Sequence, residues 1–223
     1  MLTLAIDCAL RRIHLGAADG EVFLGELSAD VGTRQSEALP GAVGDFLRVF
    51  GFTVSDVGRI AVTTGPGYFT GIRVGLSYAA ALAESVGALV CGVSTLRAMA
   101  LPVMEAPVAS EASPVTAPVI TAGRDSFYAA IYGARRGIGV LSGQRDVLME
   151  PSHISARDLS DRLGAFEDSG VVVVSCGAPA AAFKQSFHVL PPSGVPRGVL
   201  MAAASEPYRD PSEIRAVYLR LPC

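Results

Sequence analysis

Residues 60–83, with the sequence IAVTTGPGYFTGIRVGLSYAAALA, predict a strand, a glycine turn and a long helix in direct succession. Residues 60–62 are apolar and suit a short strand. Gly65, Pro66 and Gly67 can reverse the chain sharply, because glycine accepts backbone angles closed to other residues and proline fixes φ. The helix is predicted to start at about Thr70. Since a glycine turn before a helix can also present N–H groups to an anion, a phosphate site is the second interpretation of this turn.

The helix has an apolar surface about twice as wide as packing on one sheet requires. At 100° per residue, one narrow and mostly polar strip interrupts the apolar surface: Arg73, Ser77, Ala80 and Glu84. Small residues recur at every fourth position and form a flat ridge that another helix could approach: Gly71, Gly75, Ala79 and Ala83. Either the helix is enclosed within its own domain, or one face packs on a sheet while the other meets a second chain.

Composition describes a globular chain with enough apolar residues for a large core. Its 223 residues are 50% hydrophobic and carry a net charge of −3, with no clustered basic surface of the kind that nucleic-acid binding uses. We expect no membrane span, no signal peptide and a cytoplasmic location. Four cysteines are far apart, without metal-ligand spacing, and predict reduced thiols and no metal site: Cys8, Cys91, Cys176 and Cys223.

The first half of the chain predicts a mixed sheet with helical crossovers. Strands are expected at residues 2–7, 13–17 and 21–27, followed by a helix from an N-cap at Ser36 to Gly51. After the strand and helix of residues 60–83, another strand is expected at 88–93. This β-β-β-α-β-α-β order combines antiparallel hairpins with parallel strands reached through helices.

The second half begins after a proline-rich segment, residues 101–118, which we interpret as a linker or irregular loop. Strands are then predicted at residues 119–122, 127–132, 140–148, 171–176 and 216–219. Helices are predicted at residues 155–163, 179–186 and 200–205, with a loop between Pro191 and Pro196.

Five motifs, in this order along the chain, resemble the TsaB (YeaZ) family of the glycoprotease-like peptidase superfamily. They are LAID at 4–7, GPGYFTGIRVG at 65–75, GVSTL at 92–96, AGRDSFY at 122–128 and VYLR at 217–220. The resemblance implies the α/β fold of actin, sugar kinases and Hsp70 (ASKHA), with two ribonuclease-H-like lobes. The expected division is an N-terminal lobe at 1–103, a linker at 104–118 and a smaller C-terminal lobe at 119–223.

The resemblance also implies a function in making threonylcarbamoyladenosine beside the anticodon of tRNA. In that system TsaB is the non-catalytic partner that binds and stabilises TsaD, and with it the ATPase TsaE. The partner subunits use ATP and metal, tRNA is reached only through the complex, and TsaB alone forms a homodimer.

In this family, the first two helices form a four-helix bundle with matching helices of TsaD or of a second TsaB. We therefore expect a partner interface at eight residues, while several of them could instead face the sheet: Leu39, Val43, Leu47, Ile72, Gly75, Leu76, Ala79 and Ala83.

Two enzymatic alternatives remain. A phosphotransferase of this fold would use Asp7 with the turn of Gly65 and Gly67, which we otherwise expect to be a vestigial or shared nucleotide site. Asp7 is followed by CALRR, without the glycines and hydroxyls that would hold phosphates. A peptidase would need a metal or a nucleophile–base pair, and alignment with TsaD places Thr95 and Met99 where that relative has two metal-binding histidines.

Two further positions depart from the family pattern. Tyr68 stands where the family has serine, and Arg34 or Gln35 stands where it has a histidine before the first helix. These departures leave open how a partner is contacted at those two points.

Overall fold

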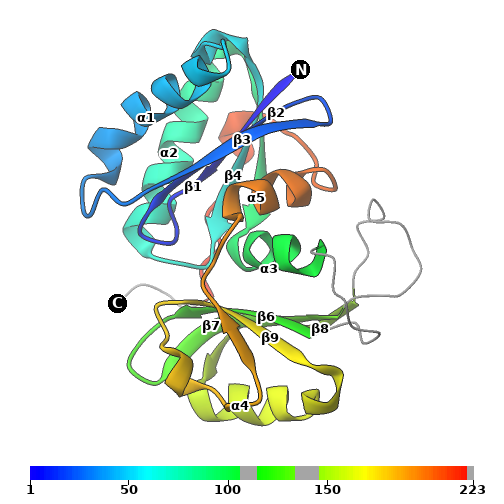
Figure 1. The fold of residues 1–223 in the computed structure, drawn as a ribbon. Helices are drawn as coiled ribbons and strands as arrows, with labels where there is room; N and C mark the ends of the chain where they lie inside the picture. Colours follow the sequence, from blue (N-terminus) through cyan, green and yellow to red (C-terminus); the bar gives the residue numbers. More distant parts are fainter. Residues whose placement is uncertain (106–114, 134–145, 220–223) are drawn as a thin grey trace. The chain divides into compact units, whose positions relative to one another are not determined.

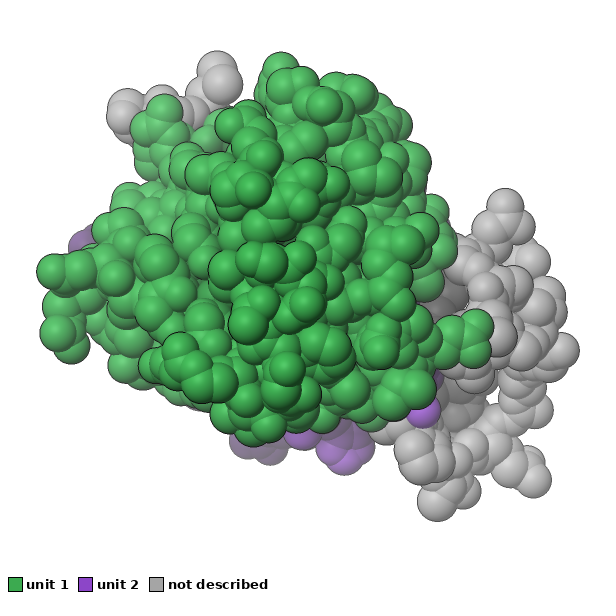
Figure 2. All heavy atoms as spheres, turned by 90° about the horizontal axis from the view of Figure 1, so that it is seen from above, with its two compact units in different colours: residues 1–98, 194–218, 222 green, residues 99–193, 219–221, 223 purple. Residues whose placement is uncertain are grey.

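The computed structural model describes residues 1–105, 115–133 and 146–219. These residues form two compact units, coloured separately in Figure 2. Unit 1 contains residues 1–98 and 194–218, and unit 2 contains residues 99–193 and Leu219.

Unit 1 is built on a five-stranded sheet in the order β3-β2-β1-β4-β5 (Figure 1). Its strands are β1 (Leu2–Asp7), β2 (Ile13–Asp19), β3 (Val22–Ala29), β4 (Val57–Gly65) and β5 (Leu89–Ser94). β1 pairs antiparallel with β2 and parallel with β4, which in turn pairs parallel with β5. The sequence-based prediction of antiparallel hairpins followed by parallel crossovers is confirmed for this unit.

Helices cover both faces of this sheet, because alternate residues of its strands point to opposite sides. Figure 1 shows α1 (Gln35–Val49) and α2 (Phe69–Val86) on one face and α5 (Val195–Ala203) on the other. Leu4 and Ile6 of β1 belong to the core under α1 and α2. On the α5 side, Gly16 of β2 leaves room for Pro196, whose Cβ lies where a side chain at residue 16 would begin. Short 3-10 helices η1 (Val54–Asp56) and η4 (Pro211–Glu213) complete the unit.

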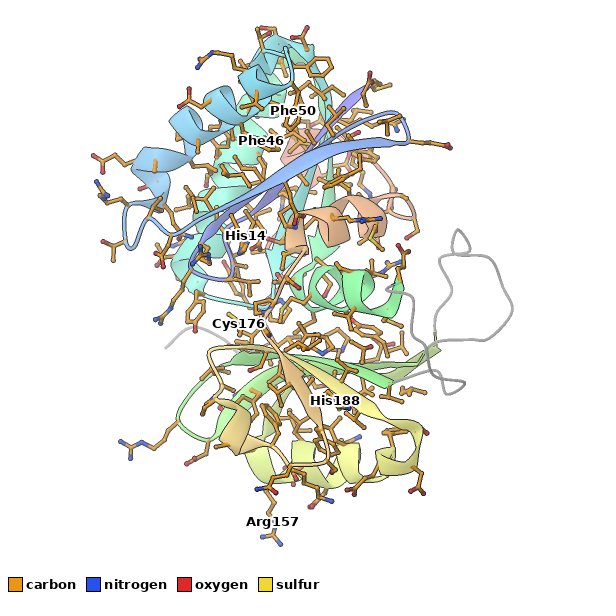
Figure 3. All side chains as sticks on the ribbon, in the orientation of Figure 1. His14, Phe46, Phe50, Arg157, Cys176 and His188 are labelled. Carbon is orange, nitrogen blue, oxygen red and sulfur yellow. The ribbon has the colours of Figure 1, made fainter. Side chains whose placement is uncertain are left out.

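Aromatic packing fixes the end of α1 against the sheet. The rings of Phe46 and Phe50 meet edge to face at 5.4 Å (Figure 3). Gly25 of β3 lies directly against the Phe50 ring and could not carry a side chain without displacing it. The edge strand β3 therefore packs against the end of α1.

Unit 2 repeats the same strand order with different strands, β8-β7-β6-β9-β10. They are β6 (Val115–Thr121), β7 (Ser126–Gly133), β8 (Asp146–Ser155), β9 (Val171–Cys176) and β10 (His188–Leu190). As in unit 1, the first two pairings are antiparallel and the last two are parallel. The expectation of an α/β fold with two ribonuclease-H-like sheets is confirmed.

The core of unit 2 lies between this sheet and α4 (Ala156–Gly164). Leu159 and Leu163 of α4 are fully buried, and the Ser155 hydroxyl caps the helix by accepting from the N–H of Asp158. Two 3-10 helices, η2 (Glu167–Ser169) and η3 (Ala180–Ala182), lie between the later strands.

Several local predictions were wrong. The segment interpreted as an irregular loop from residue 101 begins inside α3 (Thr95–Glu105), which contains Pro102, and ends inside β6; residues 106–114 lie outside the described residues. α3 tolerates Pro102 because Leu96, Ala98 and Met99 are buried and stabilise the helix by packing.

The start of α1 also differs from the prediction. Arg34, not Ser36, is at the N-cap, since the side chain of Gln35 donates to the backbone oxygens of Cys8 and Arg12 and fixes the helix start there. Pro196, expected in a loop, is in the first turn of α5, a position where its missing N–H costs nothing.

Four predictions in the second half of the chain need correction as well. Only η3 forms within the helix predicted at 179–186, and residues 216–219 form no strand, although the N–H of Val217 donates to the backbone oxygen of Thr64. The strand predicted at 140–148 starts at Asp146; residues 140–145 lie outside the described residues. Residues 194–218 belong to unit 1, whereas the expected C-terminal lobe ran from 119 to 223.

Candidate functional site

Asp7 stands at the carboxyl end of β1 and is completely buried. Its Oδ1 accepts hydrogen bonds from the Thr63 hydroxyl at 2.6 Å and from the backbone N–H of Ala9 at 3.1 Å. Among the residues that the structure describes, its Oδ2 has no hydrogen-bond partner. Burial raises the pKa of Asp7 above its usual value, although His14 and the hydrogen bond from Thr63 act in the opposite direction.

His14 is the register partner of Asp7 on β2 (Figure 3). Its Nε2 is 4.0 Å from Asp7 Oδ2, which is too far for a hydrogen bond, and neither ring nitrogen has a hydrogen-bond partner in the described part of the chain. Burial lowers the pKa of His14, and this effect outweighs the attraction of Asp7. The pair is therefore a sealed polar site in which burial disfavours the charged form of both members.

The glycine turn after β4 is filled by the chain itself. The N–H of Tyr68 donates to the backbone oxygen of Ala9 at 2.9 Å, and a Cβ at Gly67 would collide with that same residue. A Cβ at Gly71 would overlap the backbone oxygen of Cys8. The loop after Asp7 thus occupies the space where a phosphate would approach the start of α2, and these glycines serve close backbone packing.

The last residues of unit 1 close the other side of the turn. The N–H of Val217 donates to the backbone oxygen of Thr64 at 2.7 Å. Gly65 has a φ of 113° and lies against the backbone oxygen of Val217, so that no side chain fits at residue 65. Asp7, Gly65 and Gly67 are therefore brought together, as expected, but their surroundings are the protein's own backbone.

The cysteines near this region have the properties of core residues. Burial raises the pKa of the Cys8 thiol far above its usual value and that of Cys91 to about 11. Such thiols remain protonated at neutral pH and are poor nucleophiles. Thr95 and Met99, the two positions that the family resemblance led us to compare with metal-binding histidines, are both fully buried. In the described ranges, no three His, Cys, Asp or Glu side chains gather where they could hold a metal ion.

An open groove runs between α1 and α2 on the surface of unit 1. It has a volume of about 460 Å³ and is lined by Ser36, Leu39, Arg73, Val74, Ser77 and Tyr78. Val74 and the Tyr78 ring, both half-buried, supply apolar surface, and Ser36, Ser77, Tyr78 and Arg73 supply hydroxyls and one guanidinium, whereas Leu39 forms the buried floor. This α1–α2 groove contains two members of the polar strip predicted on the helix, Arg73 and Ser77, and both are exposed.

Seven of the eight residues expected at a partner interface are buried within this chain: Leu39, Val43, Leu47, Ile72, Gly75, Ala79 and Ala83. Leu76 is half-buried. The ridge of small residues faces the sheet, since a Cβ at Gly75 would contact Cys8 of the β1 end and Val62 of β4. This is the alternative that the sequence left open, and the exposed part of the two helices lies at the α1–α2 groove instead.

A group of arginines and aromatic rings surrounds the start of α2, and sequence reasoning did not find it. We call it the arginine–aromatic cluster; its members are Arg11, Tyr68, Phe69, Arg73 and Tyr218. The Arg11 guanidinium carbon lies 3.8 Å from the centre of the Tyr68 ring, and that of Arg73 lies 4.7 Å from the centre of Phe69. Phe69 and Tyr218 contact each other with ring centres 5.4 Å apart. A possible signal was the spacing of Phe69 and Arg73, which places them one helical turn apart.

Comparison with known proteins gives both a family and a fold. Residues 30–162 match the family model described as "TsaD: tRNA N6-adenosine threonylcarbamoyltransferase". A stretch of 58 residues is 41% identical to the tRNA threonylcarbamoyladenosine biosynthesis protein TsaB of Escherichia coli K12. That stretch covers 26% of this chain and 25% of the relative, so the match spans about a quarter of the relative's own length.

Two solved structures from Pseudomonas aeruginosa share the fold over nearly the whole chain. One is an uncharacterized protein with similarity to the peptidase YeaZ, with a TM-score of 0.74, 18% identity and coverage of 98% of this chain and 99% of that one. The other is YeaZ, with a TM-score of 0.71, 21% identity and the same coverage. No helix among the described residues is long and apolar enough to span a membrane.

Proposed function

This chain belongs to the family of the tRNA N6-adenosine threonylcarbamoyltransferase TsaD, as a member of its TsaB (YeaZ) branch, and from this premise we propose that it is the non-catalytic partner of TsaD in tRNA threonylcarbamoyladenosine biosynthesis. It acts by binding and stabilising TsaD, and through TsaD the ATPase TsaE. Without TsaD it pairs with a second copy of itself, and tRNA is modified only by the assembled complex.

The α1–α2 groove is the observation that carries the proposal. It combines apolar surface from Val74 and the Tyr78 ring with hydroxyls and one charge at its edges, the usual arrangement of a protein interface. A helix of the partner laid along this groove would complete a bundle of helices with α1 and α2. Tyr78 suits such an interface, since a tyrosine buries a large ring while its hydroxyl can still find a polar partner.

The surroundings of Asp7 support a role without catalysis by this chain. Thr63 and Ala9 already use one carboxylate oxygen, and the backbone of Ala9 fills the space beside Gly67. Thr95 and Met99 are poor ligands for the metal that a transferase of this family would use. ATP and metal are therefore assigned to the partner subunits, and the chain's contribution is its surface.

Light scattering coupled to size-exclusion chromatography tests the proposal. The chain is measured alone and mixed with TsaD from the same organism. We expect a homodimer that is replaced by a mixed complex. Ser77→Arg puts a long charged side chain into the α1–α2 groove without touching the core and should weaken the mixed complex by about tenfold or more.

Gln185→Arg is the matched control, because it adds the same side chain at an exposed position of unit 2. Its affinity for TsaD should equal that of the unmodified protein. A chain that ignores TsaD, or a Ser77→Arg variant that binds TsaD with unchanged affinity, would contradict the assignment of the groove.

A further inference from the structure

The arginine–aromatic cluster exposes flat rings and unpaired positive charge on the same small surface. Phe69 and Tyr218 are each 38% exposed although their rings contact one another. Arg73 extends over Phe69, and Arg11 extends over Tyr68. A guanidinium that lies over a ring keeps its N–H groups directed outward in the plane, where they can still donate.

The two arginines of this cluster have no acidic partner among the described residues. Some other arginines of unit 1 are in ion pairs, such as Arg12 with Asp30 at 3.4 Å and Arg48 with Asp45 at 2.6 Å. Within residues 1–105, 115–133 and 146–219, no ion pair joins Arg11 or Arg73 to a carboxylate. These two exposed guanidiniums are therefore available to an anionic group of another molecule.

We propose that the arginine–aromatic cluster binds an unpaired segment of RNA, with a base stacked on Phe69 or Tyr218 and phosphates held by Arg73 and Arg11. Exposed aromatic rings flanked by arginines are how proteins hold unstacked bases, because every base has a flat face and every nucleotide carries an anion. Duplex RNA offers phosphates but no free base faces, so the rings select a loop. The inference rests on the proposed function only for the identity of the RNA, which is then the anticodon loop of the tRNA.

The acidic net charge of the chain is compatible with this site. The chain has no overall excess of basic residues, since its net charge is −3, but two arginines contact only about two phosphates and need no wider basic surface. The expected interaction is therefore weak in the isolated chain, confined to a few nucleotides, and only moderately dependent on salt. It would position a loop that the complex holds by other contacts as well.

The test is fluorescence anisotropy with the full chain and a labelled anticodon stem-loop RNA at low ionic strength. Arg73→Gln and Phe69→Leu should each weaken binding by about tenfold. Arg73→Gln should also lower the slope of log affinity against log salt by about 0.7, the value for one lost phosphate contact on a single strand. Arg48→Gln removes an exposed arginine of α1 outside the cluster. It should change neither the affinity for the RNA nor the salt slope.

Thermal unfolding establishes that each variant is folded, and Tyr218→Leu replaces Phe69→Leu if the latter is not. Binding of the stem-loop no tighter than of a blunt RNA duplex, or an equal loss with Arg48→Gln, would overturn the proposal. So would displacement of the RNA by equimolar AMP, which would indicate a free-nucleotide site.

Complex formation with TsaD is measured separately on the same variants. Variants that lose TsaD but keep the RNA would show a protein interface and overturn the inference. RNA binding by a chain that ignores TsaD would support the cluster while contradicting the proposed function.

Discussion

Oδ2 of Asp7 lies 4.0 Å from Nε2 of His14, and both side chains are buried on neighbouring strands without a hydrogen bond between these atoms. Burial shifts the pKa values of the two groups in opposite directions. Native Asp7 holds its proton more tightly than in the unfolded chain, and native His14 holds its proton less tightly. Folding is therefore linked to pH through two groups whose contributions oppose each other.

Replacing Asp7 by asparagine should stabilise the protein at neutral pH. Because burial raises the pKa of Asp7, its contribution to stability is present below the usual aspartate pKa and is lost as the pH rises through the native value. Asp7→Asn keeps an oxygen for Thr63 and Ala9 and removes the buried charge, so we expect a gain of about 1 kcal/mol near pH 7. Urea unfolding at about pH 4 and pH 7 measures it, and the gain should shrink in acid. A loss of stability at neutral pH would show that the carboxylate is favourably solvated.

Replacing His14 should remove an acid sensitivity. Since burial lowers its pKa, the contribution of His14 is present above the usual histidine pKa and is lost as the pH falls below it. In the Asp7→Asn background, the free energy of unfolding should decline between about pH 7 and pH 5, and His14→Gln should abolish that decline. An unchanged slope in the double variant would mean that another group is responsible.

Gly71 and Gly44 offer a matched pair of helical glycines. A Cβ at Gly71 overlaps the backbone oxygen of Cys8, whereas nothing lies within 4 Å of one at Gly44. Gly71→Ala should cost about 1–3 kcal/mol or more, and Gly44→Ala should be neutral or add up to about 1 kcal/mol. Thermal unfolding compares them. Equal effects would mean that the loop after Asp7 can move away from α2.

Ala79 and Ala81 distinguish the buried face of α2 from its exposed face. Ala79 is fully buried and Ala81 is exposed. Ala79→Leu should destabilise the chain by about 1–3 kcal/mol, because the sheet leaves no room for three more carbons, while Ala81→Leu should stay within about 0.5 kcal/mol. If Ala79→Leu kept full stability yet lost TsaD, the sequence-based expectation of an interface at Ala79 would be supported after all.

Nucleotide binding by the isolated chain should be absent, because backbone atoms of Ala9 and Val217 occupy the surroundings of the glycine turn. Calorimetric titration with ATP and Mg²⁺ should give no heat of binding, and the midpoint of thermal unfolding should not move. A saturable signal that disappears in Asp7→Asn would restore the phosphotransferase alternative.

Most strands were predictable from the sequence because they are short apolar runs bounded by glycine or acidic turn residues, as in residues 2–7 and 171–176, whereas β10 (His188–Leu190) was not predicted. α3 was missed because the proline-rich composition of residues 101–118 was interpreted as a linker, while the buried packing that offsets Pro102 is not visible in the sequence. The period of α2 correctly identified the exposed strip of Arg73 and Ser77, but a nearly continuous apolar surface does not say which side meets the sheet.

The candidate site was predicted less well, since its contacts join residues distant in sequence. Asp7 was expected at the end of the first strand, but the burial of His14 beside it depends on the register of a hairpin. The arginine–aromatic cluster depends on the return of Tyr218 to Phe69 from the far end of the chain. Neither relationship follows from local periodicity.

The two sheets have identical pairing order, yet their connections differ. Unit 1 joins β4 to β5 through the eighteen residues of α2, whereas unit 2 joins β9 to β10 through a segment whose helical content is the three residues of η3. The pairing order of each sheet therefore does not depend on the secondary structure of the segment that connects its parallel strands. The connecting segments can change in length and in surface residues while the strands keep their pairing. Two units with the same sheet order can therefore differ in function.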